Sequence, residues 1–282
     1  MNFDFAQVSV PFRMRPGLVR LEPGALHLTP LHPGSTLHAE KLAIHRQGAT
    51  RQVLAGFDPT DALAAIREQA LKAGVDMPLA DTLPLELQVE EDLVVLDTAT
   101  GRIPWMCVSV PSRWAPEEKI GLSLASIHSP VADGEALAAA LPHLLRVLSN
   151  GTHWERYVWT LSPSPRYDQH PQRQPLQNWP DTDDATAVAQ QCHFRAERQT
   201  FIPLFDTQGQ PRSQVVFTIR VMVAPLATAL RTPADAQRLH DSISSMSEAV
   251  LAYKNLTPAR ARLLTWLQER AGGPPASHPN PV

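Results

Sequence analysis

His128 is the residue of this chain best suited to bind a metal. It stands in the sequence Ile-His-Ser-Pro-Val at 127–131, after a stretch whose proline and acidic residues from Pro116 onward predict the start of a helix. A metal ion takes a neutral imidazole that a rigid element holds in place, and the second ring nitrogen then bonds a nearby acceptor. The alternative for His128 is a structural role, in which its ring bonds a main-chain carbonyl at the end of the helix.

Glu197 is the best candidate for a catalytic carboxylate. It lies between Arg195 and Arg198 in the sequence Arg-Ala-Glu-Arg-Gln-Thr-Phe at 195–201. Two guanidinium groups close to one carboxylate stabilise its ionised form, which is the form that a cationic ligand requires in a pocket of low dielectric. The alternative is a structural ion-pair network that holds this segment against a sheet.

The order and spacing of these segments resemble the haem-dependent oxidative N-demethylase family. The resemblance is carried by Pro-Ser-Arg-Trp at 111–114, Lys-Ile-Gly at 119–121, Ile127–Val131, Arg195–Phe201 and Val215–Arg220. It implies a PAS-like domain that holds haem b through His128 and has Glu197 at its catalytic site. It also implies the oxidation of a small secondary amine such as dimethylamine by O2, with release of formaldehyde. Family enzymes draw electrons from separate flavin and iron–sulfur subunits, and this chain shows no binding motif for either.

The resemblance also assigns basic residues to cofactor binding, namely Lys119, Arg156, Arg195 and Arg198. A guanidinium group such as that of Arg156 matches the carboxylate of a haem propionate bidentately. For Arg156 the alternative is a surface salt bridge. For Lys119 the alternative is a solvated side chain.

Two departures from the family pattern keep other functions open. Val158 stands where the family's Arg-x-Asn-Trp strand has asparagine, and Phe201–Phe205 replaces a stretch that contains arginines. One alternative is a haem-binding sensor or carrier of the same fold that does not demethylate amines. The other is a haem-free scaffold protein that has kept the fold.

Composition argues against several classes of protein. The chain has 282 residues and a formal net charge of -3, so it lacks the excess of basic residues that nucleic-acid binding requires. No apolar run approaches the ~20 residues of a membrane helix, and the first residues show no signal peptide, so we expect no membrane partner and a cytoplasmic location. The two cysteines suggest neither a zinc site nor a disulfide framework. The acidic run Glu90-Glu91-Asp92 is typical of a solvated turn rather than a metal site.

The pattern of elements predicts an α+β fold. Strands are predicted at 85–89, 93–96, 105–110, 157–161 and 215–223, and helices at 59–72, 116–128, 134–148 and as a C-terminal pair between 239 and 266. Because strands and helices mix without regular alternation, we expect an antiparallel sheet with flanking helices, and the resemblance implies that this sheet is PAS-like. We expect one domain at 1–271, a proline-rich insertion at 162–180 and a disordered tail at 272–282.

Overall fold

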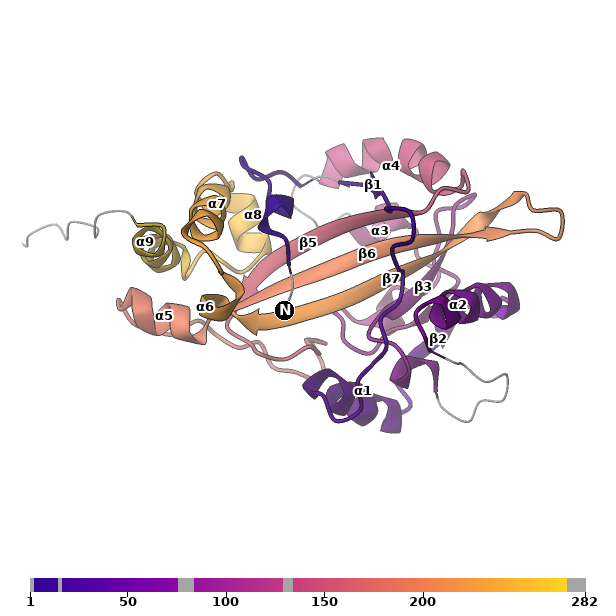
Figure 1. Ribbon diagram of the computed structural model, residues 1–282, viewed down its shortest axis with the longest axis horizontal. Coiled ribbons are helices and arrows are strands. Elements are labelled where there is room, and N and C mark those ends of the chain that lie inside the picture. The colour runs from indigo at the N-terminus through magenta and orange to yellow at the C-terminus, as the bar shows by residue number, and fades with distance from the viewer. Residues whose placement is uncertain (1–2, 15–16, 76–83, 129–133, 273–282) are drawn as a thin grey trace, which may run out of the picture.

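The computed structural model describes residues 3–14, 17–75, 84–128 and 134–272, without the side chains of residues 128 and 134–138. In this part of the chain, seven strands form one antiparallel sheet in the order β1-β5-β6-β7-β3-β4-β2 (Figure 1). The strands are β1 (Val19–Arg20), β2 (Arg51–Val53), β3 (Asp92–Asp97), β4 (Trp105–Cys107), β5 (Trp154–Ser162), β6 (His193–Phe205) and β7 (Pro211–Pro225). The three longest strands, β5, β6 and β7, lie side by side in the sheet.

Helices cover both faces and the ends of the sheet. They are α1 (Thr36–Arg46), α2 (Thr60–Lys72), α3 (Leu124–His128), α4 (Gly134–Leu148), α5 (Ala185–Gln191), α6 (Leu226–Ala229), α7 (Pro233–Ser244), α8 (Glu248–Tyr253) and α9 (Arg260–Arg270). Short 3-10 turns add η1 (Phe5–Gln7), η2 (Leu85–Leu87) and η3 (Pro116–Glu118). Side-chain oxygens of Ser35, Thr232 and Ser247 accept main-chain N–H groups at the starts of α1, α7 and α8, which explains where these helices begin. Within the described ranges, no helix has the length and apolar character needed to cross a bilayer.

The two faces of the sheet carry different side chains, because successive residues of a strand point to opposite sides. One side, which we call the α3 face, carries one in-register row formed by Val158, Glu197 and Val221. The other side, the α7 face, carries the neighbouring row formed by Tyr157, Arg198 and Arg220. Figure 1 views the sheet from its α7 face, with α3 behind it.

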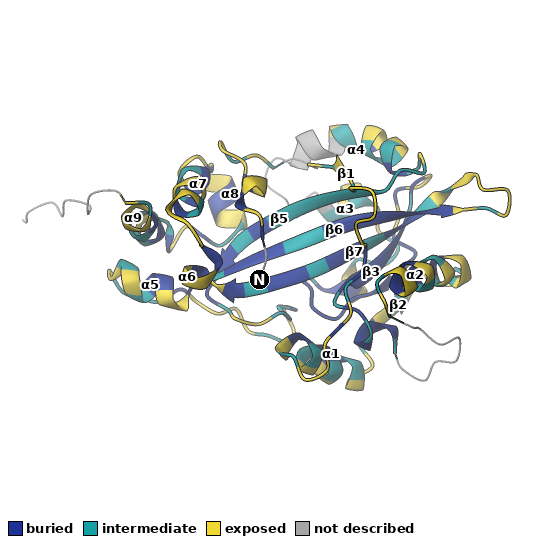
Figure 2. Ribbon diagram, in the orientation of Figure 1, coloured by how far each residue is buried: buried dark blue, intermediate teal, exposed yellow. Residues whose placement is uncertain are grey.

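Apolar clusters cover both faces, and the buried residues follow the central strands (Figure 2). On the α7 face, Trp159 and Phe194 pack under η1 and the C-terminal helices, while residues of β3 and β4 pack under α2. On the α3 face, Val94 and Val221 pack against Leu124 and Ile127 of α3. Each fully buried large apolar side chain contributes about 1.5–3 kcal/mol, so these clusters are the main source of stability and hold α3 against the sheet.

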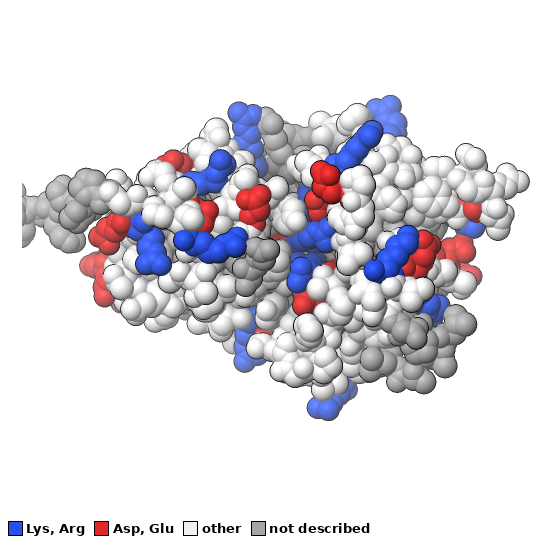
Figure 3. Space-filling view, in the orientation of Figure 1, with Lys and Arg blue, Asp and Glu red and all other residues white. Residues whose placement is uncertain are grey.

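The surface over the α7 face carries charges of both signs. Lys and Arg side chains lie among Asp and Glu side chains in the view of Figure 3, and no broad area of one sign dominates it. This mixture agrees with the small net charge of the sequence.

The predicted fold class is confirmed. The chain is α+β, with an antiparallel sheet, flanking helices and a helical C-terminal region. The five strands β4-β3-β7-β6-β5, with α3 and α4 crossing from β4 to β5 over one face, form the PAS-like sheet that we expected. The predicted helix at 134–148 has the bounds of α4, and the insertion at 162–180 lies between β5 and α5.

Several predicted elements are wrong in type or length. Residues 85–89 form η2 and one bridge rather than a strand, because buried Glu86 turns toward Thr50 (2.7 Å) and His45 (2.8 Å). The predicted helix at 116–128 is interrupted between η3 and α3, where Gly121 has a φ of 74°. The first of the two C-terminal helices is divided at 245–247, where Ser247 begins α8. The predicted disordered tail lies outside the described residues after Gly272.

A buried ion pair links α1 to β3. Lys41 Nζ lies 3.3 Å from Asp92 Oδ1, with side-chain exposures of 0% and 2%. The two oxygens of Asp92 also accept the N–H groups of Ser109 (3.0 Å) and Val110 (2.9 Å). These bonds explain why β4 ends at Cys107, although a longer strand was predicted, and they fix the chain that leads to Ser112.

We predict that Asp92→Asn lowers the free energy of unfolding by about 3–5 kcal/mol, because the buried Lys41 ammonium loses its counter-ion and has only the carbonyl oxygens of Val89 and Glu91 as partners. Urea denaturation measures this change. The matched control is Glu68→Gln, which removes the exposed pair between Glu68 and Lys72 and should change stability by less than about 0.5 kcal/mol. Equal losses in the two variants would contradict a structural role for the buried pair.

Candidate functional site around Glu197

Glu197 lies in the middle of β6 on the α3 face, directly opposite Val158 of β5 and Val221 of β7. Ser112 Oγ donates to Oε1 of the carboxylate, and Gln199 Nε2 donates to Oε2 over 2.7 Å. A carboxylate accepts about four hydrogen bonds, so these two neutral donors orient Glu197 and leave room for further donors. The side chain is half-buried. The arrangement suits a fixed carboxylate that accepts a cationic N–H donor.

Arg195 fills the interior beside Glu197 and is 2% exposed. Its Nε donates to Ser112 Oγ over 2.9 Å, and its terminal nitrogens donate to the carbonyl oxygens of Tyr167 (2.9 Å), Arg166 (3.2 Å) and Val110 (3.2 Å). Burial lowers the pKa of Arg195, while the charges of Glu197 and Asp92 act in the opposite direction. One guanidinium group therefore ties β6 to the segment at 110–112 and to the proline-rich insertion.

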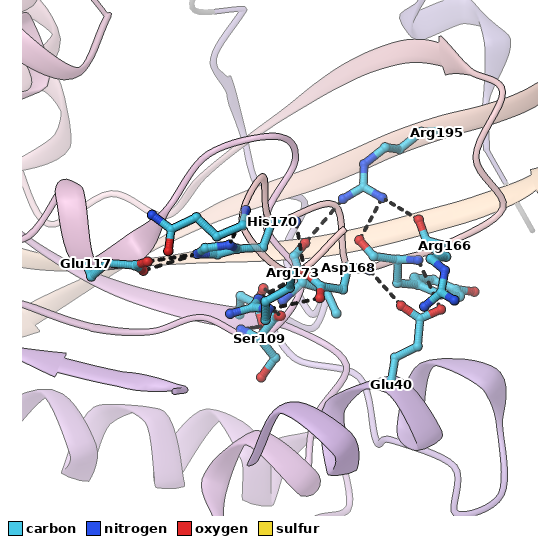
Figure 4. A network of polar contacts seen from close by, with 12 residues as sticks. Glu40, Ser109, Glu117, Arg166, Asp168, His170, Arg173 and Arg195 are labelled. Atoms are coloured by element: carbon cyan, nitrogen blue, oxygen red, sulfur yellow. Dashed lines mark hydrogen bonds and ion pairs between the residues drawn. The ribbon is translucent and has the colours of Figure 1, made fainter. Parts of the chain in front are cut away.

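A second polar network holds the insertion at 162–180 in place (Figure 4). Glu40 of α1 accepts the main-chain N–H groups of residues 167 (3.2 Å) and 168 (2.7 Å). Asp168 pairs with Arg173 over 2.9 Å, and Arg173 also donates to the carbonyl of Ser109 over 3.0 Å. Burial raises the pKa of Glu40, and its two main-chain donors oppose that shift. The carbonyl groups that bind Arg195 are thus themselves anchored.

Arg156 extends the polar network of Glu197 across β5. Its Nε donates to Gln199 Oε1 over 2.5 Å, and Gln199 in turn donates to Glu197. The terminal nitrogens of Arg156 have no hydrogen-bond partner among the described residues. Burial lowers the pKa of Arg156, and the charge of Glu197 opposes that shift. Arg156 therefore presents unused donors next to the carboxylate.

Lys254, directly after α8, is a further cation at the edge of β5. Its Nζ donates to the carbonyl of Trp159 over 2.7 Å and lies 5.3 Å from the ring centre of Phe12 and 5.5 Å from that of Trp159. Both distances are within the range of cation–π attraction. Burial lowers the pKa of Lys254 to about 8, and the charge of Glu197 opposes the shift.

The structure brings three predicted site residues together, since Arg156, Arg195 and Glu197 share the α3 face. His128 is the last residue of α3, near the helix end where it was predicted, and its side chain lies outside the described part. The preceding residue, Ile127, packs against the apolar cluster of the α3 face. The helix that ends at His128 therefore covers the same face as Glu197.

Arg198 requires a correction. It lies on the α7 face, opposite to Glu197, because the two residues are neighbours in a strand. Its Nε pairs with Glu155 over 3.0 Å, and its NH1 donates to the carbonyl of Leu26. The prediction that two arginines flank Glu197 is wrong for Arg198. Lys119 follows η3, and its half-buried side chain has no hydrogen bond or ion pair within the described residues.

The acidic run at 90–92 is divided among three partners. Glu90 pairs with Arg220 over 2.6 Å, Glu91 accepts the N–H of Thr29, and Asp92 pairs with Lys41. Burial raises the pKa of Glu91 to about 7. In the described ranges, no group of three or more His, Cys, Asp or Glu side chains is arranged to hold a metal ion.

Gln199, Lys254 and Ser112 lie around Glu197 as candidate site residues to which the sequence alone assigns no role. The spacing of Arg195, Glu197 and Gln199 at every second position is a signal for Gln199, since alternate residues of a strand share a face. Lys254 has no such signal. The packing of α8 against the edge of β5 brings its ammonium group within the electrostatic influence of Glu197.

Residues 65–264 match the model of the family described as "Haem-dependent oxidative N-demethylase, alpha subunit-like". The chain belongs to this family. The resemblance noted in the sequence is thereby confirmed. Among solved structures, the chain is similar to a sensory box sensor histidine kinase from Vibrio cholerae, with 12% identity over 58% of this chain and 98% of that one. The TM-score is 0.23, too low to support any argument, so the fold assignment depends on the strand order.

We predict that Arg195→Met destabilises the protein by more than about 3 kcal/mol, because Ser112, the buried carbonyl of Val110 and the partly buried carbonyls of Arg166 and Tyr167 lose their donor. The control is Arg198→Met on the same strand and the opposite face, where the loss should be about 1 kcal/mol for a more exposed pair. Urea denaturation compares the two variants. A larger loss in Arg198→Met would contradict the anchoring role of Arg195.

Proposed function

We propose that this protein is a haem-dependent monooxygenase that removes a methyl group from a small secondary amine such as dimethylamine. The observation that supports this most directly is Glu197, an oriented and half-buried carboxylate on the sheet face that α3 covers. A protonated amine in a poorly hydrated pocket needs an anionic partner of this kind. Family membership supplies the haem dependence and the type of reaction.

The residues on the α3 face fit a haem group. Haem is an apolar ring that carries two propionates, so it needs an apolar wall with cationic donors at one side. The partly buried apolar side chains of α3, Leu124 and Ile127, would supply that wall, and the unused nitrogens of Arg156 are suitable donors for a propionate. His128 is the residue that we propose as the iron ligand, and haem b is the form that we propose.

The side chains around Glu197 bind and orient the substrate in this proposal. Glu197 accepts an N–H of the protonated amine, while Ser112 and Gln199 keep its two oxygens in place. Arg195 holds Ser112 and closes the interior side of the site against water. Haem, when bound, supplies the activation of O2 and the oxidation of the N-methyl group, which yields formaldehyde and the demethylated amine. Electrons come from separate flavin and iron–sulfur subunits in the proposed reaction.

A haem-binding sensor or carrier is the second candidate, and one observation favours it. Val158 is directly opposite Glu197 in the sheet, and it occupies the position at which the family pattern has asparagine. An apolar side chain there removes a hydrogen-bonding group from the immediate surroundings of the carboxylate. The two functions differ in whether amines bind next to the haem.

We predict that the purified protein binds one haem b per chain and shows a Soret band. His128→Ala should abolish or shift this band, because the iron loses its protein ligand, while far-UV circular dichroism stays the same. The control is His153→Ala, because the ring of His153 bonds His27 over 2.7 Å. An unchanged spectrum in His128→Ala, or its loss only in His153→Ala, would show that His128 is not the ligand.

A second prediction separates the enzyme from the sensor. Dimethylamine should shift the Soret band of the ferric protein, and Glu197→Gln should weaken this response at least about tenfold, because the amine loses a charged hydrogen-bond acceptor. Glu155→Gln is the matched control, since Glu155 lies on the α7 face and pairs with Arg198. If dimethylamine leaves the wild-type spectrum unchanged at millimolar concentrations, the demethylase proposal fails. The haem-binding sensor or carrier is then the remaining candidate function.

A further inference from the structure

Val158 is an apolar side chain in polar surroundings. It lies directly opposite Glu197, and its neighbours on the same face of β5 are Arg156 and Thr160. Val158 is half-buried and belongs to none of the apolar clusters that the described residues form. Apolar surface that no neighbour covers is unfavourable in water. This position therefore suits an apolar group that a ligand supplies.

The row across the sheet places a valine on each side of the carboxylate. Val158 of β5 and Val221 of β7 are both in register with Glu197 of β6. The Cβ atoms of such cross-strand neighbours lie about 4.5–5.5 Å apart. An alkyl group on a nitrogen that donates to Glu197 is therefore within reach of Val158, which is the more exposed of the two valines.

Glu197 is also the one hydrogen-bond acceptor in this row. Beside it, Ser112 Oγ already accepts from Arg195, and Gln199 Oε1 already accepts from Arg156. A primary or secondary ammonium ion has three or two N–H groups, and any that finds no acceptor in a poorly hydrated site weakens binding. A tertiary ammonium ion has a single N–H and three alkyl groups, which matches one carboxylate between two valines.

We propose that Val158 determines the substrate class of this site and makes it select tertiary N-methylamines, such as trimethylamine, over secondary and primary amines. This inference depends on the proposed function, because it names the class of amine that Glu197 binds. Removal of one methyl group from a tertiary amine, with O2, two electrons from the separate subunits and two protons, gives formaldehyde, water and a secondary amine. That secondary amine is the substrate proposed above, so the tertiary amine enters the same site one step earlier.

The test measures the binding of methyl-, dimethyl-, trimethyl- and tetramethylammonium to the haem-loaded protein at pH 7 by calorimetry. The affinity compared is the part that Glu197→Gln removes, which excludes amines that bind the iron directly. Affinity should rise about three- to fivefold with each methyl group up to trimethylammonium, because each buries one more apolar carbon. It should then fall at least about fivefold at tetramethylammonium, which has no N–H to donate. A site that recognises only charge and apolar area would bind tetramethylammonium most tightly.

Variants at position 158 test the residue itself. Val158→Asn adds an acceptor beside Glu197 and removes the apolar contact, so dimethylammonium should bind it more tightly than trimethylammonium does. Val158→Thr adds a hydroxyl group at nearly the same shape and should reduce the preference for trimethylammonium at least about threefold, also if Val158→Asn is unstable. Val158→Ile is the apolar control, and Tyr157→Phe is the control on the α7 face. Both should keep the wild-type order.

Two results would overturn the role of Val158 and leave the proposed function intact. One is tighter binding of dimethylammonium than of trimethylammonium by the wild type. The other is a wild-type preference for trimethylammonium in Val158→Asn or Val158→Thr. If none of the four cations shows binding that depends on Glu197, the proposed function itself fails, and this inference fails with it.

Discussion

The burial of one guanidinium group, that of Arg195, is the constraint on which the site depends. A buried arginine is tolerated only when its donors are satisfied. Here the acceptors come from the segment at 110–112 and from residues 166 and 167 of the proline-rich insertion. Those segments are in turn fixed by Asp92 and Glu40. Because Ser112 bonds both Arg195 and Glu197, the hydrogen bonds that satisfy the buried arginine also fix the position of the carboxylate. Stability and site geometry are thus determined by the same contacts.

Strand alternation decides which charges can act together. β6 places Arg195, Glu197 and Gln199 on the α3 face and Arg198 on the other, although all four lie within five consecutive residues. On the α7 face, Arg198 lies directly opposite Arg220, and such like-charged pairs are unfavourable. Glu155 and Glu90 compensate them, one for each arginine. The α7 face therefore has balanced charges, whereas the α3 face keeps unused cationic donors beside Glu197. This difference is the reason for placing the ligand on the α3 face.

The sequence predicts those parts of the fold that depend on local signals. The helix at 134–148 and the strand at 93–96 have clear apolar patterns, and both are found. The alternation at 85–89 predicts a strand that does not form, because the buried Glu86 is held by Thr50 and His45, which are distant in sequence. The same limit applies to the site. Glu197 and Arg195 stand out as an acidic–basic segment, whereas Lys254 becomes a neighbour of Glu197 only when α8 packs at the edge of β5. Arg198 could have been excluded from the surroundings of Glu197 by treating 195–201 as a strand, because neighbouring residues of a strand point to opposite faces.

The central claim is that an amine binds between Glu197 and the haem on the α3 face. Paramagnetic relaxation of the methyl protons of dimethylamine in the ferric protein measures this most directly, because the effect falls steeply with distance from the iron. The account predicts a strong, saturable relaxation enhancement that is lost in Glu197→Gln and retained in Glu155→Gln. A haem-loaded protein without saturable enhancement, or with enhancement that Glu197→Gln leaves unchanged, would contradict it.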